Sequence, residues 1–399
     1  MNFPTTPRRV VVTGRSVLTG GVSSVGEFWK AVRRGGLLPV AQPDRETLRE
    51  LAALEKPDAS ILARHQLLAL AAAEQAWVSA GLPPHRNRLR GEGIEKQRFS
   101  RIGCISGTSL GGLAAMEEEL SRARFSPYSL SRWRGNSIGV VASVRYGLGG
   151  AEFCINAASA TGSQVLFLAA TLIRFGMLDA ALVLAADPAA TPLLGDSMSR
   201  SGSITRDSQQ LPLSAGRTGM HPVEGAACLI LESMEHATAR GGAPVAEWLG
   251  GESASAAHHL LAPETKGETL EELLRHCLEE SVAPRSSGPV DWVSLHATGT
   301  PRFDAVEVAS LKRVFPGILP WITAFKRTAG HALGASGLIE AIGVTEGLRT
   351  GEVPPWPEAT DTDLGLEVLK PAVAPRPSVA LQLGQGMGGV VVVNALAVP

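Results

Sequence analysis

Two histidines and a lysine occupy positions where α/β proteins commonly build sites. His296 ends a predicted strand and precedes a tight polar turn at residues 297–300. His331 follows Gly330 directly, at the predicted start of a helix and five residues after Lys326. A histidine at a helix N-terminus faces the positive end of the helix dipole, which keeps its imidazole neutral. One such histidine alone more often satisfies local backbone groups, whereas the three residues together favour a functional site.

Ser159 stands in a run of very small residues, 158–163, between a predicted buried strand and a predicted buried helix. A sharp strand-to-helix turn presents a side chain to a site and leaves backbone N–H groups able to stabilise an oxyanion. Serine is also an ordinary N-cap residue for a helix that starts at this place. The residues alone leave these two interpretations evenly balanced.

A glycine-rich run at residues 384–389 separates two predicted strands. It lacks the lysine of a P-loop and does not precede a helix as a dinucleotide fingerprint does, so it is weak support for phosphate binding. Close approach of the backbone to a ligand fits better. Carboxylates flank these motifs, and each alone is more typical of a helix cap or surface charge than of an acid–base catalyst: Glu224, Asp304, Glu307 and Glu340.

The composition excludes several classes of protein. The 399 residues include 37 Lys and Arg against 38 Asp and Glu, and 44% are hydrophobic. Such a chain can bury enough surface to offset chain entropy, so it is not disordered. It lacks the basic excess that neutralises phosphates, so we expect no nucleic-acid partner. The first nine residues hold no apolar signal core, and the longest apolar helical stretch, Val165–Ile173, is too short to span a bilayer.

The cysteines are scattered, without a CxxC pair or a metal-like spacing to histidines. We interpret all of them as buried reduced thiols: Cys104, Cys154, Cys228 and Cys277. The sequence therefore predicts a cytoplasmic protein with no metal site and no membrane insertion.

Helices alternate with strands along the chain, which predicts an α/β layered fold. The predicted strands are Val10–Thr13, Arg101–Ser106, Phe153–Ala157, Ala181–Asp187, Gly225–Glu232, Asp291–His296, Trp321–Ala324, Ser378–Leu383 and Val390–Leu396. The predicted helices are Val25–Arg33, Leu62–Ala80, Leu113–Arg122, Gln164–Phe175, Thr269–Glu280, Ala305–Val314 and His331–Leu348. Residues 158–175 and 330–348 each follow a strand, open with small residues and become an apolar helix. We therefore expect two related halves, 1–245 and 246–399.

These motifs together resemble those of the β-ketoacyl–acyl-carrier-protein synthase family, which has the thiolase fold. The resemblance is carried by Arg8–Gly14, by Leu295–Pro301 with Asp304 and Glu307 behind it, by Lys326–His331 followed by Gly334–Glu340, and by Gly386–Gly389. It covers essentially the whole chain, in order and at matching spacings. It implies an α-β-α-β-α layered structure of two related halves, in which the small-residue turns at 157–162, 330–337 and 384–389 converge on one site.

The resemblance also implies a mechanism. In the family, a cysteine takes an acyl group from a carrier thioester. Two histidines then serve decarboxylation of a malonyl thioester and stabilise the enolate, while a lysine organises the second histidine. These catalytic roles fall on His296, His331 and Lys326, and the supporting carboxylates are Glu340, Asp304 and Glu307.

The nucleophile position is the main departure from the family, because it holds Ser159 in place of cysteine. A cysteine thiol has a pKa of about 8.5 and is easily activated at a helix start. A serine hydroxyl needs a general base within hydrogen-bond reach, and His296 and His331 are the candidates for that base. Cys154 lies five residues earlier, inside the preceding strand, and we expect it to be a core thiol.

Further departures lie near the C-terminal glycines. Gln385 and Met387 stand where the family commonly carries phenylalanines that gate the pocket, and with Gly386 they form the expected oxyanion or gate segment. Residues 211–219 also lack the acidic residues usual in the family. These changes indicate a divergent paralogue.

By the same resemblance, the acyl group arrives on the phosphopantetheine arm of an acyl carrier protein, and no bound cofactor is expected. Thr298 and Thr300 are the expected contacts of that arm. Weak candidates for docking an acidic carrier are Arg132, Arg134 and Arg217. The family pairs through an edge strand, here residues 153–156, so we expect a homodimer or a heterodimer with a ketosynthase.

Three functions remain open from the sequence. The first is a ketosynthase-type enzyme, either acylated on Ser159 or performing decarboxylation alone through His296 and His331. The second is a catalytically silent subunit, similar to a chain length factor, that pairs with an active ketosynthase. The third and most distant is an acyltransferase that makes esters or amides.

Overall fold

The computed structural model describes residues 6–84, 86–90, 99–205, 207, 210–286, 288–357, 364–366 and 370–399. Its strands are β1 (Val10–Thr19), β2 (Ile102–Gly107), β3 (Glu152–Ile155), β4 (Ala180–Asp187), β5 (Gly225–Ser233), β6 (Ala246–Ser255), β7 (Trp292–Ser294), β8 (Trp321–Thr323), β9 (Val379–Gln385) and β10 (Val390–Ala397). Its α-helices are α1 (Val25–Arg34), α2 (Arg45–Leu51), α3 (Lys56–Ser60), α4 (Arg64–Ser79), α5 (Leu113–Ser121), α6 (Ser129–Trp133), α7 (Ser137–Tyr146), α8 (Thr161–Arg174), α9 (Pro192–Arg200), α10 (Met234–Ala239), α11 (Glu268–His276), α12 (Pro301–Val314), α13 (Lys326–Ala329) and α14 (Ser336–Thr350).

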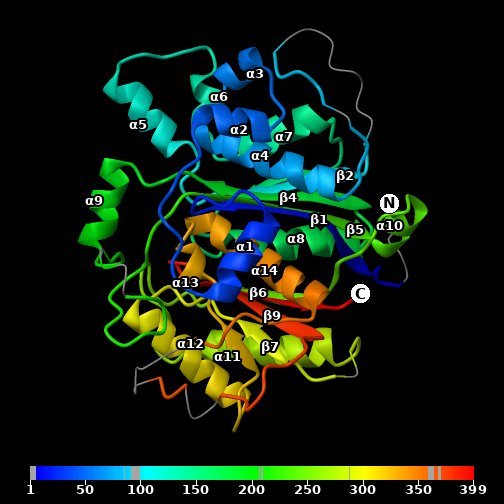
Figure 1. Ribbon diagram of the computed structural model, residues 1–399, viewed down its shortest axis with the longest axis vertical. Helices are drawn as coiled ribbons and strands as arrows, with labels where there is room; N and C mark the ends of the chain where they lie inside the picture. The colour runs from blue at the N-terminus through cyan, green and yellow to red at the C-terminus, as the bar shows by residue number, and fades with distance from the viewer. Residues whose placement is uncertain are drawn as a thin grey trace.

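Helices and strands alternate in five layers (Figure 1). Helices α2, α4 and α7 cover one face of the strands β1, β2, β4 and β5, and helices α1, α8 and α14 lie in the middle layer. Strands β6, β7 and β9 follow, with α11 and α12 outside them. The ten strands of the described residues still form one hydrogen-bonded sheet, because β1 pairs antiparallel with β6 through Val10–Val12.

The strand order is the same in the two halves of the chain. The sheet reads β3-β2-β4-β5-β1-β6-β10-β9-β7-β8. Adding five to the number of each strand in the first half, β3-β2-β4-β5-β1, gives β8-β7-β9-β10-β6. This is the order of the second half when it is read from its outer edge inward. The pairing directions correspond as well, since β2 is parallel to β3 and β4, as β7 is to β8 and β9. We therefore propose that the boundary between the two halves lies at residue 245, as the sequence predicts.

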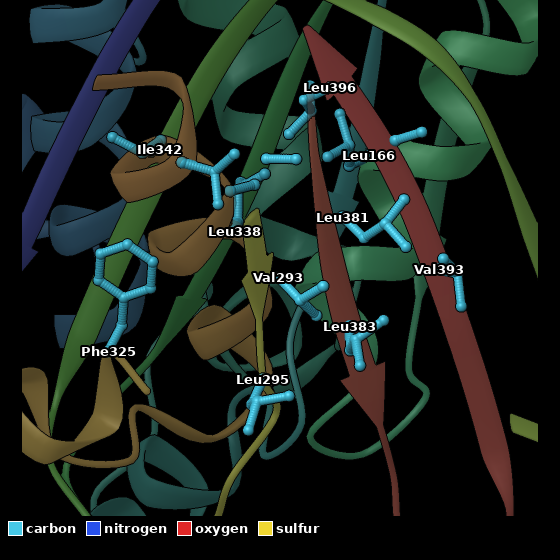
Figure 2. Close-up of a cluster of buried hydrophobic side chains, with 14 of the residues drawn as sticks. Leu166, Val293, Leu295, Phe325, Leu338, Ile342, Leu381, Leu383, Val393 and Leu396 are labelled. Carbon is cyan, nitrogen blue, oxygen red and sulfur yellow. The ribbon is translucent and has the colours of Figure 1, made fainter. Parts of the chain in front are cut away.

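The middle layer is buried on both sides, which explains why α8 and α14 are apolar around most of their circumference. Figure 2 shows Leu166 of α8 and Leu338 of α14 in one cluster with Leu381 of β9 and Val393 of β10. These side chains are essentially inaccessible to solvent. This core packs against the ends of β3, β7, β8 and β9, where the loops that follow these strands begin.

The structure corrects the predicted end of the first strand. The sequence predicts a strand that ends at Thr13, but β1 continues to Thr19 and the register with β5 shifts between Val12 and Gly14. A β-carbon at Gly14 would meet the carbonyl oxygen of Ala76 in α4. Glycine is thus required there by close packing of α4 on the strand, which the local sequence does not reveal.

Several elements escaped prediction, among them β6 and α7. Strand β6 contains Gly250 and Gly251 among serines and glutamates, so it shows no apolar alternation, although its first residues are buried. Gly250 lies against Ser281, and Gly251 against the carbonyl of Val393. Helix α7 lies in a segment for which no helix was predicted, and it ends at Gly147 in the left-handed conformation. Close packing at these two glycines explains why the sequence pattern does not predict β6.

Candidate functional site

Three turns of small residues meet near the starts of α8 and α14 and the end of β9, as the sequence predicts. A β-carbon at Gly162 would collide with the backbone nitrogen of Leu338. One at Gly386 would collide with the carbonyl oxygen of Ala157. The small residues are therefore needed because main chain packs on main chain.

Ser159 lies half-buried in the turn between β3 and α8. The helix begins at Thr161, and the residue at its N-cap position is Ala160, with no side-chain cap. The Thr161 hydroxyl closes the turn: it accepts from the N–H of Ala157 at 2.8 Å and donates to the carbonyl of Ala158 at 2.7 Å. The N-cap interpretation of Ser159 is therefore wrong, and its side chain is left for another role.

Lys326 connects His296 to a buried carboxylate. Its ammonium donates to Glu340 and, at 2.6 Å, to the carbonyl oxygen of His296. Its Nζ also lies 3.3 Å from His296 Nδ1. All three residues are at least 98% buried. A lysine ammonium has three donors, so these three acceptors use all of them.

This arrangement corrects the role that the resemblance implied for the lysine. The resemblance assigns the lysine to the second histidine, but the hydrogen bonds of Lys326 within the described residues go to Glu340 and to the first histidine, His296. The reason is the backbone: α13 is a single turn that ends at Gly330, where a φ of 70° redirects the chain before His331.

His331 is fixed by main-chain pairing, not by the start of a helix. Helix α14 begins only at Ser336. The N–H of His331 donates to the carbonyl of His221 at 2.7 Å, and its carbonyl accepts from the N–H of Val223 at 3.0 Å. The predicted helix N-terminus is therefore wrong. Burial, and then the positive charge of Lys326, hold the pKa of His331 well below its usual value.

Both imidazoles are neutral, and both carry their proton on Nε2. Burial, and then the charge of Lys326, also hold the pKa of His296 well below its usual value. His296 Nδ1 accepts from Lys326, and His331 Nδ1 accepts from the N–H of Leu333 at 3.0 Å. A neutral imidazole that accepts at one nitrogen donates at the other, which assigns the tautomers from the hydrogen bonds.

The two rings are arranged to serve one small ligand. Their centroids are 6.0 Å apart, and the planes are nearly perpendicular, at 89°. His331 Nε2 is buried and has no hydrogen-bond partner among the described residues. A buried donor without a partner is costly unless a ligand satisfies it. His296 and His331 can therefore offer N–H groups to an oxygen that develops negative charge.

Two carboxylates of α12 hold the turn that carries His296. Glu307 accepts from the N–H groups of His296 and Ala297, both at 2.8 Å, and Asp304 accepts from the N–H of Gly299 at 3.1 Å. Burial raises the pKa of Asp304 to about 6 and that of Glu307 to about 7. Their bonds to backbone hold this turn in place, and the supporting role that the resemblance implies for them stays a prediction.

The core anchors each of these polar residues through a neighbour in sequence. Leu295 precedes His296, and Phe325 precedes Lys326; both are buried in the cluster that Figure 2 shows. Leu338 plays the same part for Glu340, two residues away on α14. The side chains of the site thus stand on a packed apolar base, which restricts their movement.

The predicted pantetheine contacts hold one another. The hydroxyls of Thr298 and Thr300 lie 2.8 Å apart, and Thr298 Oγ1 also accepts from the N–H of Thr300 at 3.2 Å. They form the polar turn before α12, beside the turn of His296. This place suits a contact with the arm, and that role stays a prediction.

The gate segment is divided between inside and outside. Gln385 is buried at the end of β9, and its Nε2 has no hydrogen-bond partner among the described residues. Met387 is 37% exposed, and Gly386 lies between them against the turn of Ser159. Their gating role stays a prediction.

One of the arginines expected to dock a carrier protein, Arg217, is buried. Arg217 is 93% buried, and its Nε lies 3.4 Å from Asp304, so it belongs to the base of the histidine turn. Arg132 is mostly occupied by an ion pair with Glu119 at 2.7 Å. Arg134 is exposed. Arg217 therefore has a structural role, and the prediction that it docks a carrier protein is wrong.

The cysteines are all free, and three of them are buried as predicted: Cys104, Cys228 and Cys277. Cys154 differs, because it lies half-buried on β3, the edge strand of the sheet. Burial still raises the pKa of its thiol, which disfavours the thiolate that a nucleophile needs.

Four polar residues near the site escaped the sequence analysis as site residues: Asp187, Ser163, Gln382 and Asn394. Asp187 accepts from the N–H of Gly334 at 2.8 Å, and the other three share a buried hydrogen-bond network. Gln382 and Asn394 interrupt otherwise apolar strands, and each is fully buried. A polar residue inside an apolar strand was the available signal, because buried polar groups require partners.

Among the described residues, no group of three or more His, Cys, Asp or Glu side chains is placed to hold a metal ion. Within the same residues, no helix is both long and apolar enough to cross a membrane.

Comparison with known proteins identifies the relatives of this chain. The family model for the N-terminal domain of β-ketoacyl synthases matches residues 49–237, and the model for the C-terminal domain matches residues 245–360. The 3-oxoacyl-[acyl-carrier-protein] synthase 2 of Coxiella burnetii is 26% identical over 388 residues, which cover 90% of this chain and 91% of that protein.

Solved structures agree. A type II polyketide acyl-carrier protein in complex with its ketosynthase bound to a hexaketide matches with a TM-score of 0.83 and 25% identity, covering 99% of this chain and 100% of that one. The ishigamide ketosynthase/chain length factor matches with the same score, identity and coverage. The predicted thiolase-like α/β fold is thereby confirmed.

Proposed function

The chain belongs to the β-ketoacyl synthase family, and on that premise we propose that it acts on malonyl thioesters of an acyl carrier protein in fatty-acid or polyketide biosynthesis. Relatives of the chain are synthase-type enzymes. Within that chemistry, we propose decarboxylation of the malonyl group as the reaction that this site performs.

The observation that carries the proposal is the pair of Nε2–H donors. Both Nδ1 atoms are occupied as acceptors, by Lys326 at His296 and by Leu333 at His331. Donors that are fixed before the reaction stabilise a developing oxyanion without reorganisation. The enolate oxygen of an acetyl thioester is such an oxyanion.

The reaction needs these two donors and one water molecule. The bond between the carboxylate carbon and the α-carbon of the malonyl thioester breaks, and carbon dioxide leaves. The electron pair passes into the enolate, whose oxygen accepts from His296 and His331. A water molecule then gives a proton to the α-carbon, and the hydroxide that remains combines with carbon dioxide as bicarbonate. The product is the acetyl thioester on the carrier.

The same tautomers argue against Ser159 as an acyl acceptor. A serine nucleophile needs a base to take its proton, and an imidazole nitrogen that already carries hydrogen cannot do so. Among the described residues, the Ser159 hydroxyl also has no hydrogen bond to either histidine. Condensation through an acyl-serine, and ester or amide formation by the same route, are therefore disfavoured.

The proposal includes a carrier protein and a second subunit. The malonyl group would arrive on phosphopantetheine, with Thr298 and Thr300 beside the arm and no other cofactor. Pairing would use β3, an edge strand on which Phe153 is 44% exposed. Unpaired edges favour strand addition. A homodimer and a heterodimer with a ketosynthase both satisfy this geometry, and we place the protein in the cytoplasm.

Purified protein with malonyl-carrier protein tests the reaction, with acetyl-carrier protein measured by mass spectrometry. We expect His296→Ala and His331→Ala each to lower the rate about 100-fold or more, as loss of an oxyanion donor does. Ser159→Ala should keep most of the rate. His65→Gln is the control, because His65 is a buried histidine that contacts Ser137 on α7, away from the site. Absence of acetyl product, or equal rates in the histidine variants, would contradict the proposal.

The silent-subunit alternative is favoured by Ser159 and by similarity to the ishigamide ketosynthase/chain length factor. Co-expression with a cysteine-bearing ketosynthase tests it. A heterodimer whose activity is unchanged by His296→Ala and His331→Ala would favour this alternative. Formation of a homodimer alone would exclude it.

A further inference from the structure

A buried glutamine links the two halves of the chain beneath the site. Gln382 is in β9, fully buried. Its Nε2 donates to the hydroxyl of Ser163 on α8 at 2.9 Å and lies 3.4 Å from Glu340 Oε2 on α14. Since Ser159 precedes α8 by two residues and Glu340 binds Lys326, one side chain reaches both parts of the site.

The orientation of this amide is determined by a neighbour. Asn394 of β10 donates through Nδ2 to Gln382 Oε1 at 3.2 Å and to the carbonyl of Ser163 at 3.1 Å. Trp248 Nε1 donates to Asn394 Oδ1 at 3.0 Å, which settles which atom of Asn394 is nitrogen. Gln382 must therefore present its NH₂ group to three acceptors: the carbonyl of Leu383 at 2.8 Å, the hydroxyl of Ser163 and Glu340. Its two N–H groups are shared among them, and the contact with Glu340 is the longest of the three.

Glu340 is consequently contacted by a donor at each of its oxygens. Lys326 donates to Oε1, and Gln382 faces Oε2. We propose that Gln382 is a positioning residue, which holds Glu340 against Lys326 and thereby aims Lys326 at His296. This inference deepens the proposed function and rests on it.

Among the described residues, the charged group that contacts Glu340 is Lys326 of α13. His296 lies beyond Lys326, and so does His331. Strands β9 and β10 and the first turns of α8 contain no ionisable residue. Burial raises the pKa of Glu340 to about 7, while Lys326 and the hydrogen bond from Gln382 act in the opposite direction. Loss of the Gln382 amide should raise this pKa further.

The pH profile of malonyl-carrier decarboxylation tests the inference. We expect Gln382→Leu to move the acidic limb upward by about 0.5–1 pH unit, the effect of one long hydrogen bond to a charged group. Gln382→Met is the second variant, because its unbranched chain fills the same space if leucine does not fold. Gln164→Leu is the control: Gln164 is on α8 and accepts from Ser253 at 2.7 Å, so its loss should leave the limb unmoved. A Gln382 variant with the wild-type profile would overturn the inference.

Unfolding separates failure of this inference from failure of the proposed function. Below about pH 5, Glu340 is protonated in both wild type and Gln382→Met, and the stability difference reflects packing and neutral hydrogen bonds alone. As pH rises through 7, ionised Glu340 loses a donor only in the variant, so the shift in denaturation midpoint should grow up to pH 8.5. A shift that is constant with pH would overturn the inference even if wild type decarboxylates nothing. A growing shift would support it in that case.

Discussion

The loops after β2 and β7 occupy corresponding places in the two halves, and a buried carboxylate holds each. Asp187 accepts from two consecutive N–H groups at residues 109–110, and Glu307 accepts from two at residues 296–297. Burial raises the pKa of both side chains, to about 6 for Asp187 and about 7 for Glu307. The same device stabilises both loops.

The two carboxylates differ in what else they bind. Asp187 also accepts from the hydroxyl of Thr108 at 2.7 Å and from the N–H of Gly334 at 2.8 Å, so it joins the first half to the second. Among the described residues, the hydrogen bonds of Glu307 stay within its own half, under the turn of His296. The first carboxylate is therefore a clamp between the two halves, whereas the second supports the loop that carries His296.

Truncation should give the largest difference between the two regions. We expect Asp187→Ala to lower the free energy of unfolding by about 3–5 kcal/mol, because it leaves several buried donors without an acceptor. Glu307→Ala should cost about 2–3 kcal/mol, because it leaves two. Urea denaturation followed by circular dichroism measures both. A larger loss in Glu307→Ala would contradict the assignment of Asp187 as the clamp.

When each carboxylate is replaced by its isosteric amide and the rate of decarboxylation is measured, the change at Glu307 should have the larger effect. Glu307→Gln replaces one acceptor under the His296 turn by a donor, so we expect decarboxylation to slow about tenfold, or ~1.4 kcal/mol. Asp187→Asn should change the rate by less than about threefold, because its loop carries no reacting group. Malonyl-carrier turnover gives both values. Equal losses would mean that the two loops do not differ in function.

The pH dependence of stability should show the smallest difference. An acid whose pKa is raised by folding binds a proton more tightly in the native state, so the free energy of unfolding falls as pH rises from its unfolded to its folded pKa. The slope is at most about 1.4 kcal/mol per pH unit for each group. Removing the acid removes that slope. The deficit of Asp187→Asn should therefore shrink between pH 4 and 6, and that of Glu307→Gln should continue to shrink up to pH 7. Deficits that are constant with pH would contradict the direction of both shifts.

Much of the fold was predictable because it depends on patterns within short segments. The apolar run of β4 and the small-residue turn before α8 indicate a strand and a close approach in any context. What failed depends on contacts distant in sequence. Gly14 lies in a strand because α4 packs on it, and β6 is a strand although glycines hide its alternation.

The residues of the site were likewise predictable from short motifs, whereas their contacts were not. Spacing alone brought His296, His331 and Lys326 forward as candidates, and the resemblance supplied their roles. It could not show that Lys326 binds the first histidine, since that depends on where Gly330 turns the chain. Nor could it show that Arg217 is buried, because its partner Asp304 is 87 residues away.

Intact-protein mass after incubation with malonyl-carrier protein shows whether Ser159 takes part in the reaction. Because both histidines are fixed as donors, we expect Ser159 to accept no acyl group. Acetyl-carrier protein should accumulate while the mass of the protein stays unchanged. An added malonyl or acetyl mass that peptide mapping places on Ser159 would contradict this expectation.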